Sequence, residues 1–241
     1  MAERGLVAKT TLLIRKDLLV ETRARDTLPP MLAFCLTVAL LLAFSLPGNT
    51  VMQDVVEVPI GTVALADVIA GFLWITILFA GLIGFARTFE VERADGALDA
   101  LLLVPLDRSG LFAAKALSNL VYVAVVQIVL VPVFALFFSL SLGADWLVLL
   151  VVIVLVDIGF VAIGTLFASL AAQTRSRELI LPVLALPALV PIFIAAVELT
   201  SDLFMGEGLD AVAARGWFGV LLLFDLIFVT VGALAFEFAV D

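Results

Sequence analysis

The sequence predicts an all-α membrane protein in which residues 1–241 form one domain that crosses the bilayer six times. Hydrophobic residues make up 64% of the chain and charged residues 15%, whereas soluble domains average about 45–50% and about 25%. Six apolar stretches are long enough, or nearly so, to cross a hydrocarbon core of roughly 30 Å as helices of about 20 residues. If these stretches are taken as six successive spans, twelve of the 13 Lys and Arg residues fall on the same side of the membrane.

This one-sided charge predicts the orientation of the chain. Cationic loops stay on the cytoplasmic side because moving them across the membrane during insertion is disfavoured. We therefore expect a multi-pass protein of the cell (inner or plasma) membrane with both termini in the cytoplasm. The opposite face has only Arg215, together with six acids: Asp54, Glu57, Asp145, Asp202, Glu207 and Asp210. The spans are expected at residues 30–46, 65–86, 117–140, 146–172, 179–199 and 216–238.

The first element, residues 1–28, precedes the first span and contains six of the cations. Its apolar residues form two triplets, 12–14 and 18–20, interrupted by Arg15 and Lys16. Long cationic side chains next to apolar surface are typical of a helix that lies in the membrane interface. We expect such an interfacial helix here, followed by a short first span bounded by Pro-Pro and Pro-Gly pairs, which stop helices.

The connection after the second span, residues 87–115, is long for a link between membrane helices. Three of its leucines recur at i, i+3 and i+4, which predicts an apolar stripe on a short helix that ends at a proline. The stripe could rest on lipid headgroups or on its own bundle, or it could dock into a groove of a cytoplasmic partner. The mixture of charged and apolar groups favours docking. The predicted contacts are Glu90, Glu92, Arg93, Leu98, Leu101, Leu102 and Pro105.

Three polar residues fall inside spans: Gln127 in the third, Asp157 in the fourth and Asp225 in the sixth. A charge at bilayer depth costs about 2.5–3.5 kcal/mol on insertion scales, so such residues face protein or water. One interpretation is a pathway or a route for protons. The other, which we favour, is hydrogen bonding between helices that fixes their packing.

The fifth span contains three prolines, Pro182, Pro187 and Pro191. Each removes a backbone hydrogen bond and can bend the helix. A static kink that shapes the packing is one interpretation, and a hinge that opens a lateral gap is the other.

Missing residue types restrict the chemistry. The chain has no histidine and a single cysteine, Cys35, which excludes imidazole catalysis and a disulfide. It has no G-x-x-x-x-G-K-[ST] loop for binding ATP phosphates. We therefore expect a non-catalytic subunit that binds no cofactor directly and uses ATP, if at all, through a partner. The cytoplasmic cations are a topology signal, so no nucleic-acid partner is expected.

Three blocks of the sequence resemble the haem exporter B family, CcmB. They are residues 71–119, above all 89–108 followed by Lys115; residues 174–191; and the N-terminal Arg15-Lys-Asp-Leu with Glu21 and Arg23. The resemblance implies a fold like that of ABC-2-type permeases. In that fold the N-terminal segment lies along the cytoplasmic face and the first cytoplasmic connection contacts an ATPase. The second block adds another expected cytoplasmic contact, at Arg175, Arg177 and Glu178.

The same resemblance implies the membrane subunit of an ATP-binding-cassette (ABC) transporter that acts in cytochrome c maturation. The implied partners are a CcmA-like ATPase and a CcmC-like haem-handling membrane protein, with haem as the transported or handled ligand. Two ATPase domains sandwich ATP, so two copies of this chain are expected as a homodimer. Three alternatives stay open: an ABC-2-type exporter of a lipid, drug or glycan; a secondary carrier driven by an ion gradient; and a non-transporting scaffold.

Overall fold

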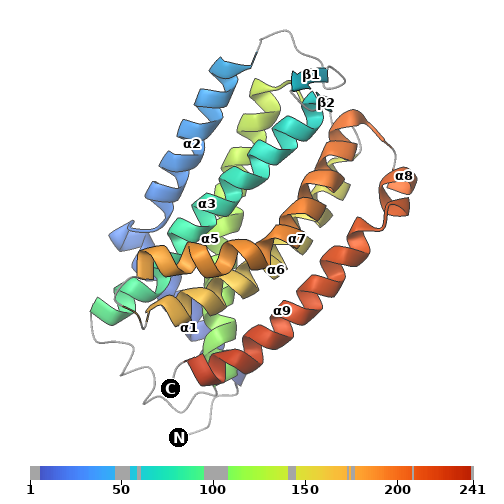
Figure 1. Cartoon of the computed structure of the whole chain (residues 1–241). Coiled ribbons are helices and arrows are strands. Elements are labelled where there is room, and N and C mark those ends of the chain that lie inside the picture. The colour runs from blue at the N-terminus through green and yellow to red at the C-terminus, as the bar shows by residue number, and fades with distance from the viewer. Residues whose placement is uncertain are drawn as a thin grey trace, which may run out of the picture.

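The computed structural model describes residues 6–46, 55–58, 61–94, 108–140, 145–172, 174, 177–207 and 209–239. Long helices packed side by side form the molecule (Figure 1). The helices are α1 Leu6–Ala24, α2 Leu28–Ser45, α3 Leu65–Ala94, α5 Arg108–Phe137, α6 Trp146–Ala172, α7 Arg177–Met205, α8 Leu209–Ala214 and α9 Trp217–Ala239. Two short strands, β1 Val55–Val58 and β2 Gly61–Ala64, lie between α2 and α3.

Six helices, α2, α3, α5, α6, α7 and α9, are long and apolar enough to cross a membrane. This confirms the six-span, all-α fold class. The bounds of α6 are those predicted, and α2 and α9 differ from the prediction by one or two residues. Successive spans run in opposite directions, so α1 and the C-terminal end of α9 lie at one end of the bundle (Figure 1). We call this the α1 end; the strands and α8 lie at the other, the hairpin end.

The structure adds detail to two segments between the spans. Helix α3 continues to Ala94 and α5 begins at Arg108, so helix covers both ends of the segment predicted as one connection over residues 87–115. At the hairpin end, β1 and β2 pair antiparallel, with Val55 opposite Ala64 and Val58 opposite Gly61. This hairpin was not predicted, because a four-residue strand is too short to show a period in the sequence.

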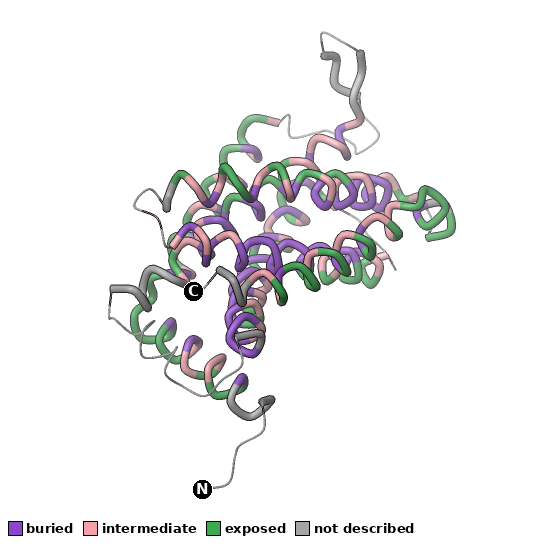
Figure 2. Tube along the Cα trace, turned by 60° about the horizontal axis from the view of Figure 1, so that its bottom comes forward, coloured by how far each residue is buried: buried purple, intermediate pink, exposed green. Residues whose placement is uncertain are grey.

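Helices α3 and α6 form the centre of the bundle. In their most apolar windows 67% and 56% of residues are buried, against 22% for α2 and 17% for α9. Figure 2 shows the same distribution, with buried residues gathered along the inner helices. The outer faces are rich in large exposed hydrophobic residues such as Phe44, Leu136 and Leu226. An apolar outer surface of this extent is stable against lipid and not against water.

Two glycines allow α3 and α6 to approach closely. A Cβ atom at Gly81 would lie 2.3 Å from the ring of Phe160, and one at Gly164 would lie 2.1 Å from the ring of Phe85. The two rings also contact each other, with centroids 4.9 Å apart. Each helix thus inserts an aromatic ring above a glycine of the other, which is the small-residue packing expected between membrane helices.

Helix α7 contains all three prolines of the fifth span, Pro182, Pro187 and Pro191, within one helical segment. Figure 1 shows this helix changing direction along its length. Proline removes a backbone donor and its ring crowds the preceding turn, so a bend here is expected. The kink interpretation therefore has structural support, whereas the hinge stays a prediction.

Candidate functional site: a polar clamp at the α1 end

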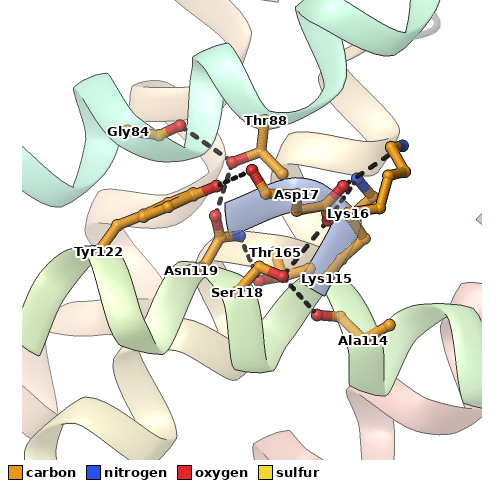
Figure 3. A network of polar contacts seen from close by, with 10 residues as sticks. All are labelled: Lys16, Asp17, Gly84, Thr88, Ala114, Lys115, Ser118, Asn119, Tyr122 and Thr165. Atoms are coloured by element: carbon orange, nitrogen blue, oxygen red, sulfur yellow. Dashed lines mark hydrogen bonds and ion pairs between the residues drawn. The ribbon is translucent and has the colours of Figure 1, made fainter. Parts of the chain in front are cut away.

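A buried ion pair joins α1 to α5. The Asp17 carboxylate accepts a hydrogen bond from Lys115 Nζ at 2.9 Å, and Ser118 Oγ, at 3.3 Å, shares its one hydroxyl proton between Asp17 and the backbone carbonyl of Ala114 at 3.0 Å (Figure 3). Tyr122 donates its hydroxyl to the backbone carbonyl of Asp17 at 3.3 Å. The three α5 residues are spaced i, i+3 and i+7 and so lie on one face of that helix. We call Asp17, Lys115, Ser118 and Tyr122 the α1 clamp.

The α1 clamp is shielded from solvent. Only 4% of the Lys115 side chain and 9% of the Asp17 side chain are exposed. Lys16 also approaches Asp17, at 3.3 Å, but is 42% exposed. Charges are retained in such places only when they are paired and hydrogen-bonded, because losing one partner leaves an uncompensated buried charge. The clamp therefore fixes the position of α1 against α5 more strictly than apolar contact alone.

A second set of hydrogen bonds continues from α5 into the centre of the bundle. Asn119, directly after Ser118, donates to Thr165 Oγ1 of α6 at 2.9 Å. It accepts from Thr88 Oγ1 of α3 at 2.6 Å. Asn119 is 1% exposed and Thr165 is fully buried. We call these three residues the Asn119 bridge, and together with the α1 clamp it links α1, α3, α5 and α6.

Glu21 fastens α1 to the first span. Its carboxylate accepts from the backbone N–H groups of Thr27, at 3.1 and 3.2 Å, and of Leu28, at 2.7 Å. The first N–H groups of a helix have no partner within it, and the Thr27 side chain makes no capping bond to α2. The chain turns between the helices at Arg25, whose φ of 57° is left-handed. Glu21 therefore caps α2 from one helix away.

Helix α1 turns polar residues, together with Leu13 and Leu18, toward the protein, and its outward face carries exposed leucines among polar residues such as Arg15 and Arg23. Thr10, Asp17 and Glu21 are buried, whereas Leu12 and Leu19 are 44% and 49% exposed. Exposed leucines on a helix beside a membrane-spanning bundle fit contact with lipid in the interface. The predicted N-terminal helix is thus present, and its outward face has the composition that an interfacial position requires.

The α1 clamp and the Asn119 bridge include residues of the two helices, α3 and α5, that flank the segment predicted to contact a partner. Lys115 is in the first turns of α5, just after residues 95–107, and Thr88 is near the end of α3, just before them. These bonds join the two helices that flank that segment, α3 and α5, to α1 and α6.

Most of the predicted partner contacts lie outside the described side chains. The backbones of Glu90, Glu92 and Arg93 belong to the last turns of α3, and those of Arg177 and Glu178 open α7. Leu98, Leu101, Leu102, Pro105 and Arg175 lie outside the described residues altogether. The end of α3, the start of α5 and the start of α7 all lie at the α1 end of the bundle (Figure 1).

The polar residues predicted inside the membrane occupy two separate places. Gln127 donates to Asp157 Oδ1 at 2.8 Å and so joins α5 to α6. Asp225 of α9 is near Gly159 instead, where an added Cβ would lie 2.5 Å from Asp225 Oδ1. Residues 157 and 159 point about 200° apart around a helix, so the structure does not bring the acids into one line. Gln127 and Asp157 make the interhelical bond we favoured.

A charged cluster lies at the hairpin end. Arg215, the only cation predicted on this side, pairs with Asp202 at 2.6 Å and with Glu207 at 2.7 Å. Ser201 donates to Asp67 of α3, and Trp74 of α3 donates to Thr200 of α7 at 2.8 Å. These bonds hold the hairpin ends of α3 and α7 together. Among the described residues, no group of three or more His, Cys, Asp or Glu residues is arranged to hold a metal ion.

Sequence reasoning alone did not identify the α1 clamp. Asp17, Glu21 and Lys115 were noted only as parts of the blocks that resemble a family. A usable signal was present, because Lys115, Ser118 and Tyr122 form a polar stripe on the end of an otherwise apolar span. Such a stripe needs a polar partner in or next to the membrane.

Comparison with known proteins identifies the family. The family model described as CcmB protein matches residues 8–241. The chain belongs to the CcmB family. This CcmB family member is 31% identical to heme exporter protein B of Rhodobacter capsulatus over 187 residues, which cover 78% of this chain and 80% of that protein.

Two further relatives have the same printed name. Heme exporter protein B of Haemophilus influenzae is 28% identical over 134 residues, covering 55% of this chain and 59% of that protein. Heme exporter protein B of Pseudomonas aeruginosa is 24% identical over 184 residues, covering 76% of each. The matches together support the assignment of this multi-pass membrane protein to the CcmB family.

Proposed function

We propose that this chain is the membrane subunit of an ABC transporter that exports haem, or releases a haem-loaded carrier, during cytochrome c maturation. The family match over residues 8–241 supports the class of protein, and the names of the three relatives support haem as the cargo. The chain lacks an ATP-binding loop, so a CcmA-like ATPase supplies the energy. A CcmC-like protein presents the haem, and a second copy of this chain completes the pair.

The observation that supports coupling is the pair of hydrogen-bonded sets at the α1 end. The segment from Glu90 to Pro105 is the contact for the ATPase, and it lies in the chain between the spans formed by α3 and α5. Asn119 bonds to Thr88 of α3 and to Thr165 of α6, while Lys115 bonds to Asp17 of α1. When the ATPases close on ATP, displacement of the segment moves all four helices together. This chain therefore transmits work and performs no chemistry.

The proposed orientation puts the α1 end in the cytoplasm. Twelve of the 13 Lys and Arg residues fall there, as the positive-inside rule requires. Six spans return the C-terminal end of α9 to the same side as α1 (Figure 1). The hairpin end, with Arg215 and its acidic partners, then faces outward, where the haem would be delivered.

The experiment replaces Leu98, Leu101 and Leu102 by Ser in the full chain. The expected result is normal membrane insertion, loss of co-purification with the ATPase, and loss of cytochrome c maturation. The matched control is Leu209→Ser, which changes a 51% exposed leucine at the hairpin end and should leave both readouts unchanged. Full maturation with undiminished ATPase binding in the triple variant contradicts the proposal.

A second arm separates the transporter from a scaffold. Maturation is measured with the wild-type chain and an ATPase partner whose hydrolysis has been abolished by mutation. A coupled transporter then fails, whereas maturation at the normal level would show that the chain only holds other proteins together.

A further inference from the structure

A groove between α3 and α7 opens on the outside of the bundle in its hairpin half. It encloses about 360 Å³ and is lined by apolar residues, among them Trp74 and Phe193. Gly71 forms part of its wall, and a Cβ atom there would meet nothing within 4 Å. The groove follows α3 from Gly71 to Leu78 and α7 from Val190 to Glu198, about 10–12 Å of helix length. That is most of one leaflet, whose hydrocarbon is about 15 Å thick.

One lining residue is charged. Glu198 is half-buried at the end of the groove nearest the hairpin. One turn further along α7 is Asp202, whose Oδ1 pairs with Arg215 and whose Oδ2 is buried without a hydrogen-bond partner. Among the described residues the groups acting on Asp202 are Arg215, of opposite charge, and Glu207, Glu198 and Asp67, of like charge. Asp202 therefore lies among three other acids and one guanidinium, so the charge next to this end of the groove is negative on balance and favours a cation.

The groove is open on the outside of a membrane-spanning bundle, and its lining is apolar except for Glu198, which suits the acyl chain of a lipid. An acyl chain is one methylene wide and apolar throughout, so it fits both the volume and the lining. The head attached to that chain must satisfy Glu198 with a cation that donates hydrogen bonds.

Arg215 supplies the complementary charge for the rest of the head. Its guanidinium uses two donors, toward Asp202 and Glu207, and its side chain is 42% exposed. A guanidinium has five N–H groups, so donors remain for a phosphate. We propose that the α3–α7 groove binds one phosphatidylethanolamine molecule, with an acyl chain against Trp74 and Phe193, the ammonium at Glu198 and the phosphate toward Arg215. This site is independent of the coupling role proposed above.

The test uses the full chain in nanodiscs of equal parts phosphatidylethanolamine and phosphatidylcholine, from which it is released for native mass spectrometry. The expected result is one retained lipid per chain, with phosphatidylethanolamine preferred about tenfold, because the choline head lacks the N–H donors that a carboxylate accepts. Glu198→Gln should reduce the preference to nearly onefold. Gly71→Leu should remove the retained lipid by filling the groove.

The matched control is Gly219→Leu on α9, because a Cβ atom at Gly219 also meets nothing within 4 Å. It should retain the lipid. Each variant is first checked for folding by the thiol labelling of Cys35, which is 1% exposed. Retention in proportion to nanodisc composition, or equal loss in both glycine variants, overturns the site. Loss of a chain dimer in Gly71→Leu with retained lipid would assign the groove to a second copy and equally overturn it.

Discussion

Replacing Lys115 by Met removes the cation of the α1 clamp while keeping most of the side-chain volume. The Asp17 carboxylate, 9% exposed, then loses its partner at 2.9 Å and keeps only Ser118 at 3.3 Å and the half-exposed Lys16 at 3.3 Å. Breaking a buried ion pair by removing one partner costs about 3–5 kcal/mol. We expect the lower value, about 3 kcal/mol, because two weaker contacts remain.

The melting temperature provides the assay. Cys35 is the single cysteine of the chain and is buried in α2, so a thiol-reactive fluorophore reports when the bundle opens. A loss of about 3 kcal/mol lowers Tm by roughly 6–12 °C in a protein of this size. The control is Lys16→Met, which removes a 42% exposed cation and should cost about 0–1 kcal/mol.

A double-mutant cycle isolates the pair itself. Asp17→Asn combined with Lys115→Met removes both charges from the buried site, so the double variant should be more stable than the sum of the two single losses predicts. The coupling energy between the sites should be at least about 1 kcal/mol. Equal melting temperatures for the Lys115→Met and Lys16→Met variants would refute the conclusion that the clamp fixes α1 to α5. A coupling energy of zero in the double-mutant cycle would refute it as well.

Three further changes test individual contacts with the same thiol assay. Glu21→Ala removes the cap of α2 and should cost about 2 kcal/mol, whereas Arg23→Ala on the exposed side of α1 should cost little; equal melting of the two would contradict the cap. Gly159→Leu forces a side chain against a carboxylate oxygen and Ile192 and should cost about 1–3 kcal/mol. Gly219→Leu, in open space, should be neutral, and a similar loss in both would rule out close α6–α9 packing as the reason. Asp157→Ala leaves the amide of Gln127 unpaired between α5 and α6 and should cost about 0.6–2 kcal/mol; an unchanged Tm would show that the bond contributes nothing.

The spans could be predicted from the sequence because bilayer thickness dictates both their length and their composition. The predicted bounds of the fourth span, residues 146–172, are those of α6. Some span ends were less predictable. Helices α3 and α5 continue beyond the apolar region, to Ala94 and from Arg108, because a helix can extend into the interface without hydrophobic residues.

The α1 clamp could not be predicted for a different reason. Asp17 and Lys115 are 98 residues apart in the chain, and no local period connects them. Their contact depends on how α1 folds back along α5, which only tertiary packing decides. The pairing of Gln127 with Asp157, and the separate position of Asp225 near Gly159, likewise depend on the rotation of each helix about its own axis. The sequence indicates that polar residues in or next to the spans need partners, and the structure shows which partners they have.

We propose that this chain couples a partner ATPase to events at the outer face of the membrane. The most direct test is purification of the tagged full chain from its own membranes in mild detergents, with mass spectrometry of everything that accompanies it. We expect a stoichiometric ATP-binding-cassette ATPase together with cytochrome c maturation proteins. Recovery of the chain without an ATPase, across several mild detergents, would contradict coupling to an ATPase and favour a carrier that needs no ATP.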